Sequence, residues 1–277
     1  MSALKSSLIA VLIACLPLGA GAAARYGVAA KHAAAMPASE SEQLQGIVSN
    51  LLQDNEDFVK NHNAAYYKPL IAGQTPRATV VTCSDSRVHT QAFDKTPDGD
   101  LFMVRNIGNQ LVTAEGSVEY GVHHLHTPLL IFVGHSSCGA INAASGNYAK
   151  ESSAIRRELK SIRIAKGVAN ADGVRTNVNN QVAAALKKFA HEVKQGDLTV
   201  IGAVYDFAND FGQGFGKLNV INLNGETDRA RIKASKLIAG AAVRENPAAG
   251  KHSITSGGEA PRQPRAVNAD SAAYSYP

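Results

Sequence analysis

Tryptophan is absent from this 277-residue chain, cysteine occurs only three times, and charged residues make up only 18% of the sequence. There is no internal repeat and no long low-complexity segment. The net charge of +5 is modest and scattered. Without a basic stripe and interleaved aromatic residues, nucleic-acid binding is not expected. What is present, a hydrophobic content of 45%, is enough for one sizeable domain with a full core.

The first 24 residues have the pattern of a cleaved secretory signal. Lys5 is their only charged residue, an apolar run covers 8–18, and small residues follow up to Ala24. The apolar run is too short for a membrane span. We therefore expect a periplasmic or secreted protein. The alternative is a lipoprotein, because the sequence Leu-Ile-Ala-Cys ending at Cys15 resembles a lipobox and makes Cys15 a possible lipid anchor.

The rest of the chain alternates helical and strand patterns, which predicts an α/β fold: a single domain with a mainly parallel central β-sheet flanked by helices. Strands are expected at 78–82, 101–104, 129–133, 198–204 and 218–222. The expected organisation is a signal peptide (1–24), a flexible lead (25–40), a catalytic domain (41–225), and a segment (226–277) with a possible short helix followed by a disordered tail.

Two short motifs directly follow predicted buried strands. The first begins at Cys83, and the second contains His135 and Cys138. Ligand sites of parallel sheets collect at the carboxyl ends of strands, so the two motifs are expected to converge. Two thiolates and one imidazole are the ligands of a catalytic zinc site with one position left open. The alternative is a structural disulfide between Cys83 and Cys138, since an exported chain cleaved after residue 24 keeps only these two cysteines.

Asp85 and Arg87 lie two and four residues beyond the first thiolate. A zinc site with two thiolates and a neutral imidazole carries no net charge, and it benefits from a hydrogen-bond acceptor beside its bound water. Asp85 is placed to be that acceptor, and Arg87 to hold it ionised through a charge-assisted pair. A disulfide requires neither side chain, so this pair favours the metal site. The other interpretation of the pair is a local salt bridge in a loop.

Cys83-x-Asp85-x-Arg87 followed by His135-x-x-Cys138 resembles the signature of the β-class carbonic anhydrases. The similarity runs from about Gln74 to Phe207. It implies a carbonate dehydratase, a zinc-dependent lyase that hydrates CO2 reversibly to bicarbonate and a proton by attack of zinc-bound hydroxide. It also implies one Zn2+ per subunit, held by Cys83, His135 and Cys138, with Asp85 and Arg87 as the orienting pair.

In the plant-like branch of that family, Gln74 matches a glutamine that contacts substrate. Phe102, Ile107 and Tyr120 fall on the apolar substrate pocket, although Phe102 and Ile107 are also explained as core residues. Part of the pocket comes from a neighbouring subunit, so the resemblance implies a homodimer or higher homo-oligomer. Val80 replaces the tryptophan of the allosterically regulated branch, which indicates an open site.

Two other functions stay open. One is hydrolysis of carbonyl sulfide or carbon disulfide on the same scaffold, since the chemistry requires only a small apolar electrophile and a positioned hydroxide. The other is a non-catalytic secreted protein with a disulfide. A zinc hydrolase of larger substrates is disfavoured, because the chain contains neither His-Glu-x-x-His nor Gly-x-Ser-x-Gly.

Overall fold

The computed structural model describes residues 40–71 and 73–241. The predicted signal peptide, Cys15 and the segment after residue 241 lie outside these residues. Within them, no helix is both long and apolar enough to cross a membrane. The contacts divide the chain into two units that meet between Lys68 and Pro69.

The first unit contains helix α1 (Glu40–Asn61) and most of α2 (Ala64–Ile71). Helix α1 begins at the last residue of the expected lead. The ring of His62 stacks on that of Phe58, with centroids 3.9 Å apart, and contacts the tilted ring of Tyr66 at 4.2 Å. This cluster fastens the end of α1 to the start of α2.

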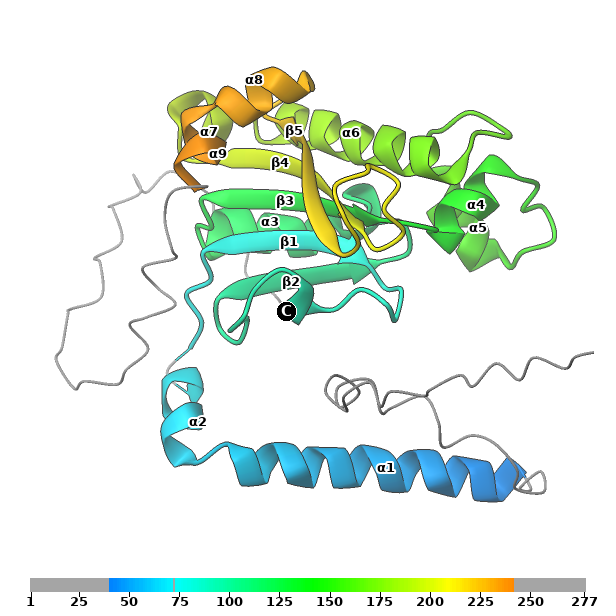
Figure 1. Cartoon of the computed structure of the whole chain (residues 1–277), viewed down its shortest axis with the longest axis vertical. Coiled ribbons are helices and arrows are strands. Elements are labelled where there is room, and N and C mark those ends of the chain that lie inside the picture. The colour runs from blue at the N-terminus through cyan, green and yellow to red at the C-terminus, as the bar shows by residue number, and fades with distance from the viewer. Residues whose placement is uncertain (1–39, 72, 242–277) are drawn as a thin grey trace, which may run out of the picture. The chain divides into compact units, whose positions relative to one another are not determined.

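The second unit is built on a five-stranded sheet in the order β2-β1-β3-β4-β5 (Figure 1). Its strands are β1 (Ala78–Cys83), β2 (Leu101–Asn106), β3 (Leu129–His135), β4 (Thr199–Asp206) and β5 (Lys217–Leu223). The first four run parallel, and β5 pairs antiparallel with β4. The prediction of an α/β fold with a mainly parallel sheet is confirmed.

Helices surround this sheet. They are α3 (Glu115–Glu119), α4 (Gly139–Ser145), α5 (Ser153–Lys160), α6 (Asn170–Lys188), α7 (Ala190–Gln195), α8 (Arg229–Ala234) and α9 (Lys236–Ala241), with short turns η1 (Thr90–Ala92), η2 (Val112–Ala114) and the π-helical η3 (Tyr120–His124). Helix α6 packs along β3 and β4. Its residues Val182 and Ala185 join Val118 of α3 in one core cluster against the sheet.

The structure adds detail where helices had been expected. The sequence predicts one short helix after residue 225, but the structure has two separate helices there, α8 and α9. Ser235 between them has an extended backbone, and its hydroxyl oxygen accepts a hydrogen bond from the Ile238 amide, so it begins a new helix. Gly173, a residue type that disfavours a helix interior, lies inside α6. A Cβ there would come within 2.7 Å of Ile141, so this glycine allows close packing of α4 on α6.

Candidate metal centre and active site

Neighbouring strands bring the three predicted ligands together. Cys83 is the last residue of β1 and His135 is the last residue of β3. Cys138 follows in the short turn that leads into α4. Because β1 and β3 are adjacent and parallel, both carboxyl ends lie at the same edge of the sheet. The convergence predicted from the sequence is present.

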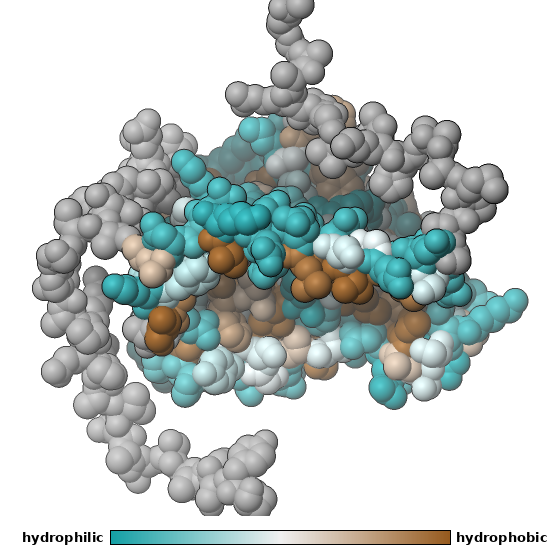
Figure 2. Space-filling model, turned by 90° about the horizontal axis from the view of Figure 1, so that it is seen from below, coloured by the Kyte–Doolittle hydropathy of each residue, from teal (hydrophilic) through white to brown (hydrophobic). Residues whose placement is uncertain are grey.

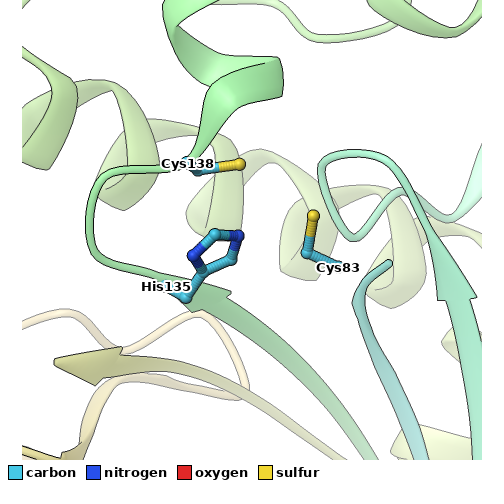
Figure 3. Close-up of side chains that lie close together, drawn as sticks. All are labelled: Cys83, His135 and Cys138. Atoms are coloured by element: carbon cyan, nitrogen blue, oxygen red, sulfur yellow. The ribbon is translucent and has the colours of Figure 1, made fainter. Parts of the chain in front are cut away.

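The ligand atoms of Cys83, His135 and Cys138 all lie within 4.8 Å of one another (Figure 3). All three residues are buried, and both cysteines are free thiols. The Nδ1 atom of His135 lies 2.9 Å from the carbonyl oxygen of Ser136. This contact assigns the proton to Nδ1 and leaves a lone pair on Nε2.

The Nε2 atom of His135 is one of the few buried side-chain atoms in the described residues without a hydrogen-bond partner. A buried polar atom is rarely left unpaired, so its lone pair requires an explanation. Two sulfur atoms beside a free imidazole nitrogen fit a Zn2+ ion. The second ring nitrogen is already fastened to a backbone carbonyl, as is usual for metal-ligating histidines.

The two thiols are not equivalent. The hydrogen bond from Cys138 lowers the pKa of Cys83 to about 4, against the opposing effect of burial, and the backbone amide of Gly108 acts in the same direction. The same contact with Cys83, together with burial, raises the pKa of Cys138 well above its usual range. The pair therefore shares one proton, and the site already stabilises a thiolate that a cation would bind.

Asp85 and Arg87 form a closely bound pair beside this cluster. Arg87 donates from Nε to Oδ1 of Asp85 at 2.9 Å and from a terminal nitrogen to Oδ2 at 2.7 Å. These hydrogen bonds hold the pKa of Asp85 well below its usual range. Oδ2 of Asp85 lies 3.9 Å from Nε2 of His135. The carboxylate is therefore both ionised and adjacent to the unpaired lone pair.

Substrate-pocket residues predicted from the resemblance fall into two groups. Ile107 follows β2 at its carboxyl end and packs against the cluster that contains Cys83 and Cys138. Phe102 lies near the opposite end of β2, and its ring centroid is 5.8 Å from that of Tyr120. Gln74 is exposed and precedes β1. It is thus separated from Cys83 by the whole strand, about 20 Å for six residues.

Several residues around the site were not identified from the sequence. Phe207 stacks on His135 with centroids 5.9 Å apart, and the guanidinium carbon of Arg87 lies 5.0 Å from the Phe207 ring centroid. Asp206 accepts a hydrogen bond from the hydroxyl of Ser136 at 2.9 Å. No sequence pattern indicated either contact, because both residues lie on β4 or just after it, outside the two motifs.

Two asparagines of α6 were missed as well. Asn170 hydrogen-bonds to the backbone of Cys138, and Asn177 to the backbone of Gly108. They are seven residues apart, which places both on one face of a helix. The spacing of the two asparagines can be read from the sequence, but the loops that they contact could not be predicted from it.

The three buried ligands at the edge of the parallel sheet form a cluster that could hold a metal ion. Residues 78–213 match the family model described as carbonic anhydrase. "Carbonic anhydrase 2" of Mycobacterium tuberculosis (strain H37Rv) is 30% identical over 177 residues, which cover 56% of this chain and 84% of that protein. The chain therefore belongs to the β-class carbonic anhydrases, which confirms the predicted family and enzyme class, carbonate dehydratase.

Solved structures agree with the fold. A β-carbonic anhydrase from Coccomyxa, solved with acetazolamide, has 25% identity and a TM-score of 0.53, covering 68% of this chain and 91% of that one. A β-carbonic anhydrase from Sordaria macrospora, described as tetrameric, has 21% identity and a TM-score of 0.52, covering 66% and 98%.

Proposed function

We propose that this protein is an exported zinc enzyme that hydrates CO2 reversibly to bicarbonate and a proton. The observation that carries the proposal is the juxtaposition of three ligand atoms within 4.8 Å and an ion-paired carboxylate 3.9 Å from one of them. Metal binding alone would not require Asp85 and Arg87. Their position indicates a site that also controls a reacting water molecule.

Cys83, His135 and Cys138 would hold one Zn2+ per subunit. Zinc, when bound, supplies a Lewis acid that lowers the pKa of a coordinated water molecule. The protein's own contribution begins with burial, which keeps other ligands away from the two sulfur atoms and the free nitrogen of His135.

Asp85 orients the attacking water. Both of its oxygens accept hydrogen bonds from Arg87, and Oδ1 also accepts from the Arg87 backbone amide at 3.0 Å. An ionised carboxylate fixed in this way accepts a hydrogen bond from the water and directs a lone pair toward CO2. Because Arg87 binds both oxygens of Asp85, the carboxylate is already paired beside the ligand set, which supports the open-site, plant-like branch that Val80 indicated.

The division of the pocket residues supports assembly of two or more copies. Ile107 lies at the metal site of its own chain, whereas Gln74, Phe102 and Tyr120 lie near the opposite ends of the strands. In a homodimer they are available to line the site of the second copy. The tetramer described for the Sordaria macrospora proteins is consistent with such assembly.

Helix α1 provides an apolar surface for this assembly. Leu51 and Leu52 are 65% and 64% exposed, and Leu44, Ile47 and Val48 extend the same stripe. The space-filling view shows hydrophobic side chains lying open among hydrophilic ones (Figure 2). An exposed apolar stripe of this length is typical of an interface, and we assign it to contact with a second copy of the chain.

Export rests on the sequence pattern of residues 1–24, with a periplasmic or secreted location as the consequence. Lipid attachment at Cys15 is the alternative processing route. Mass spectrometry of the mature protein distinguishes them. An N-terminus at Arg25 supports the cleaved signal, and a diacylated Cys15 supports the lipoprotein.

Hydrolysis of carbonyl sulfide or carbon disulfide is the second candidate, because both are small apolar electrophiles that the same geometry accommodates. Initial rates with CO2, carbonyl sulfide and carbon disulfide should be measured for zinc-loaded protein at one enzyme concentration. We expect CO2 to give the highest kcat/KM. A higher value for either sulfur compound would overturn the assignment of CO2 as the substrate.

A further inference from the structure

Side chains of helix α6 contact the backbone of Cys138 and the backbone of Gly108, whose amide donates to the sulfur of Cys83. The helix is 19 residues long and carries the buried valines 174, 178 and 182 on the side that faces the core. This burial fixes the helix against the sheet. Groups attached to it are therefore held at a defined distance from the ends of β1 and β3.

Asn170, at the start of α6, contacts the backbone of Cys138 twice. Its Oδ1 accepts a hydrogen bond from the Cys138 amide at 3.2 Å, and its Nδ2 donates to the Cys138 carbonyl at 3.0 Å. Nδ2 also donates to Oδ1 of Asn142, on α4, at 2.6 Å. The Asn170 side chain thus binds both the amide and the carbonyl of one ligand residue and connects that residue to helices α4 and α6.

Asn177 acts on the other thiol through Gly108. Its Nδ2 donates to the Gly108 carbonyl at 2.8 Å, and its own Oδ1 accepts from Nε2 of Gln181 at 3.1 Å. The amide of Gly108 in turn donates to Sγ of Cys83 at 3.5 Å. Asn177 is fully buried, so this contact is shielded from water.

The backbone conformation of Gly108 can hardly change. Its φ of +79° is a conformation that favours glycine, and a Cβ there would come within 2.7 Å of Cδ1 of Ile162. The turn that points its amide at Cys83 is therefore specified by the absence of a side chain and by the hydrogen bond from Asn177.

We propose that Asn170 and Asn177 are positioning residues that together set the separation of the two zinc-binding sulfur atoms. Both belong to helix α6, which fixes the distance between them. The inference rests on the proposed function only in taking zinc as the bound metal. Hydrogen-bond partners behind metal ligands typically change metal affinity by about 10- to 100-fold when they are lost. The residues contact neither substrate nor the reacting atoms.

The test is the rate at which zinc leaves the full, zinc-loaded chain to a chromogenic chelator. Asn170→Ala removes both contacts with Cys138, and we expect zinc release to become about 10- to 100-fold faster. Asn170→Asp keeps the acceptor oxygen and loses the donor, so its rate should fall between those of Asn170→Ala and the unsubstituted protein. Asn177→Ser should also accelerate release.

Asn180→Ala is the matched control. Asn180 lies on the same helix and donates from Nδ2 to a backbone carbonyl, that of Arg163, at 2.7 Å, but this carbonyl is outside the metal loops. We expect its zinc release to stay within twofold of that of the unsubstituted chain. If Asn180→Ala accelerated release as much as Asn170→Ala, the effect would be general loosening of α6 and the inference would be overturned.

A second readout separates positioning from simple destabilisation. In cobalt-substituted protein, the sulfur-to-cobalt charge-transfer and ligand-field bands report the geometry of the two sulfur ligands. We expect these bands to shift in Asn170→Ala and to remain in place in Asn180→Ala. If Asn177→Ser does not fold, the zinc-release rates and cobalt spectra of the two Asn170 variants test the inference by themselves. Unchanged bands and release within twofold for Asn170→Ala contradict the inference.

Neither readout uses CO2. Faster zinc release from the Asn170 variants, in a chain that does not hydrate CO2, would refute the proposed function and keep the inference. Unchanged release in an active chain would refute the inference alone.

Discussion

Arg87 joins the two halves of the metal centre through Asp85. While it binds both carboxylate oxygens, a terminal nitrogen of the same guanidinium donates to the Ser137 carbonyl at 3.1 Å. Ser137 lies between His135 and Cys138, so the side chain that fixes Asp85 also contacts the second ligand loop. Arg87 therefore fixes the orientation of Asp85 relative to the loop that carries His135 and Cys138.

Removing Arg87 should release Asp85. In Arg87→Ala we expect zinc to remain, since no ligand is lost, and kcat/KM to fall by about 10²-fold because the carboxylate is no longer held in place. Stopped-flow hydration and metal analysis measure both. Arg175→Ala is the matched control, because Arg175 is 48% exposed against 50% for Arg87 and pairs with the exposed Asp172 one turn earlier on α6. Equal activity of the two variants would remove Arg87 from the mechanism.

Asp85→Ala tests the orienting group itself. The protein should keep its zinc and lose most turnover, by about 10²- to 10⁴-fold, the range for loss of a group that accepts a hydrogen bond in the reacting state. The comparison variant is Ser86→Ala in the same exposed loop. Unchanged turnover in Asp85→Ala, with full zinc content, would show that water is oriented by another group.

Cys138→Ser should abolish zinc binding, because a serine hydroxyl does not ionise in this environment and the thiolate ligand is lost. Zinc content after dialysis against metal-free buffer measures this. Ser145→Ala, at the far end of the helix α4 that follows Cys138, should retain one zinc per chain. Full occupancy in Cys138→Ser would mean that the ligand set is wrong.

The carboxylate of Asp206 should make the stability depend on pH. Burial acts to raise its pKa, but hydrogen bonds from the amides of Phe211 and Asp210 and the hydroxyl of Ser136 outweigh burial and lower it. With the folded-state pKa below the unfolded value of about 3.9, the stabilisation is fully present above that value and is lost as the pH falls through the folded pKa.

We therefore expect Asp206→Asn to lower the free energy of unfolding by about 1.5–3 kcal/mol at pH 7 and by less as the pH falls below 4. Urea denaturation of metal-free protein from pH 7 to pH 3 gives the comparison. Asp210→Asn, on the exposed neighbour, should have little effect. A difference that does not shrink on acidification would refute the role of the ionised Asp206.

Charges placed on the α1 stripe should weaken assembly. We expect Leu51→Glu combined with Ile47→Glu to lower the measured oligomer mass at micromolar concentration, because burying two carboxylates in an apolar contact is costly. Light scattering after size exclusion measures the mass. Asn50→Glu adds a charge on the same helix without replacing an apolar residue and should leave the mass unchanged. The same mass for all three proteins would exclude this stripe as the interface.

The strands and the ligand loops could be predicted because their signals are local. Continuous apolar runs marked β1 and β3, and the cysteines and histidine follow each run directly. What depends on tertiary contacts could not be predicted. The contact of Asn177 with Gly108 joins positions far apart in the chain, and the Phe207 ring lies against Arg87 only because β4 adjoins β3.

Other features depended on backbone detail. Gly173 resembled a helix breaker, yet it lies within α6 because it allows Ile141 to approach. The separation of Gln74 from Cys83, by contrast, already followed from the strand predicted at 78–82, which the structure places between them. The sequence therefore predicted the cluster of Cys83, His135 and Cys138 better than the side chains that hold its loops in place.

The most direct test titrates metal-free, reduced protein with Zn2+ while the initial rate of CO2 hydration is followed by stopped flow. The account predicts that the rate rises linearly until one zinc per chain has been added, then stays constant, and that a chelator abolishes it. A chain shown to contain one zinc that hydrates CO2 no faster than buffer would contradict the account.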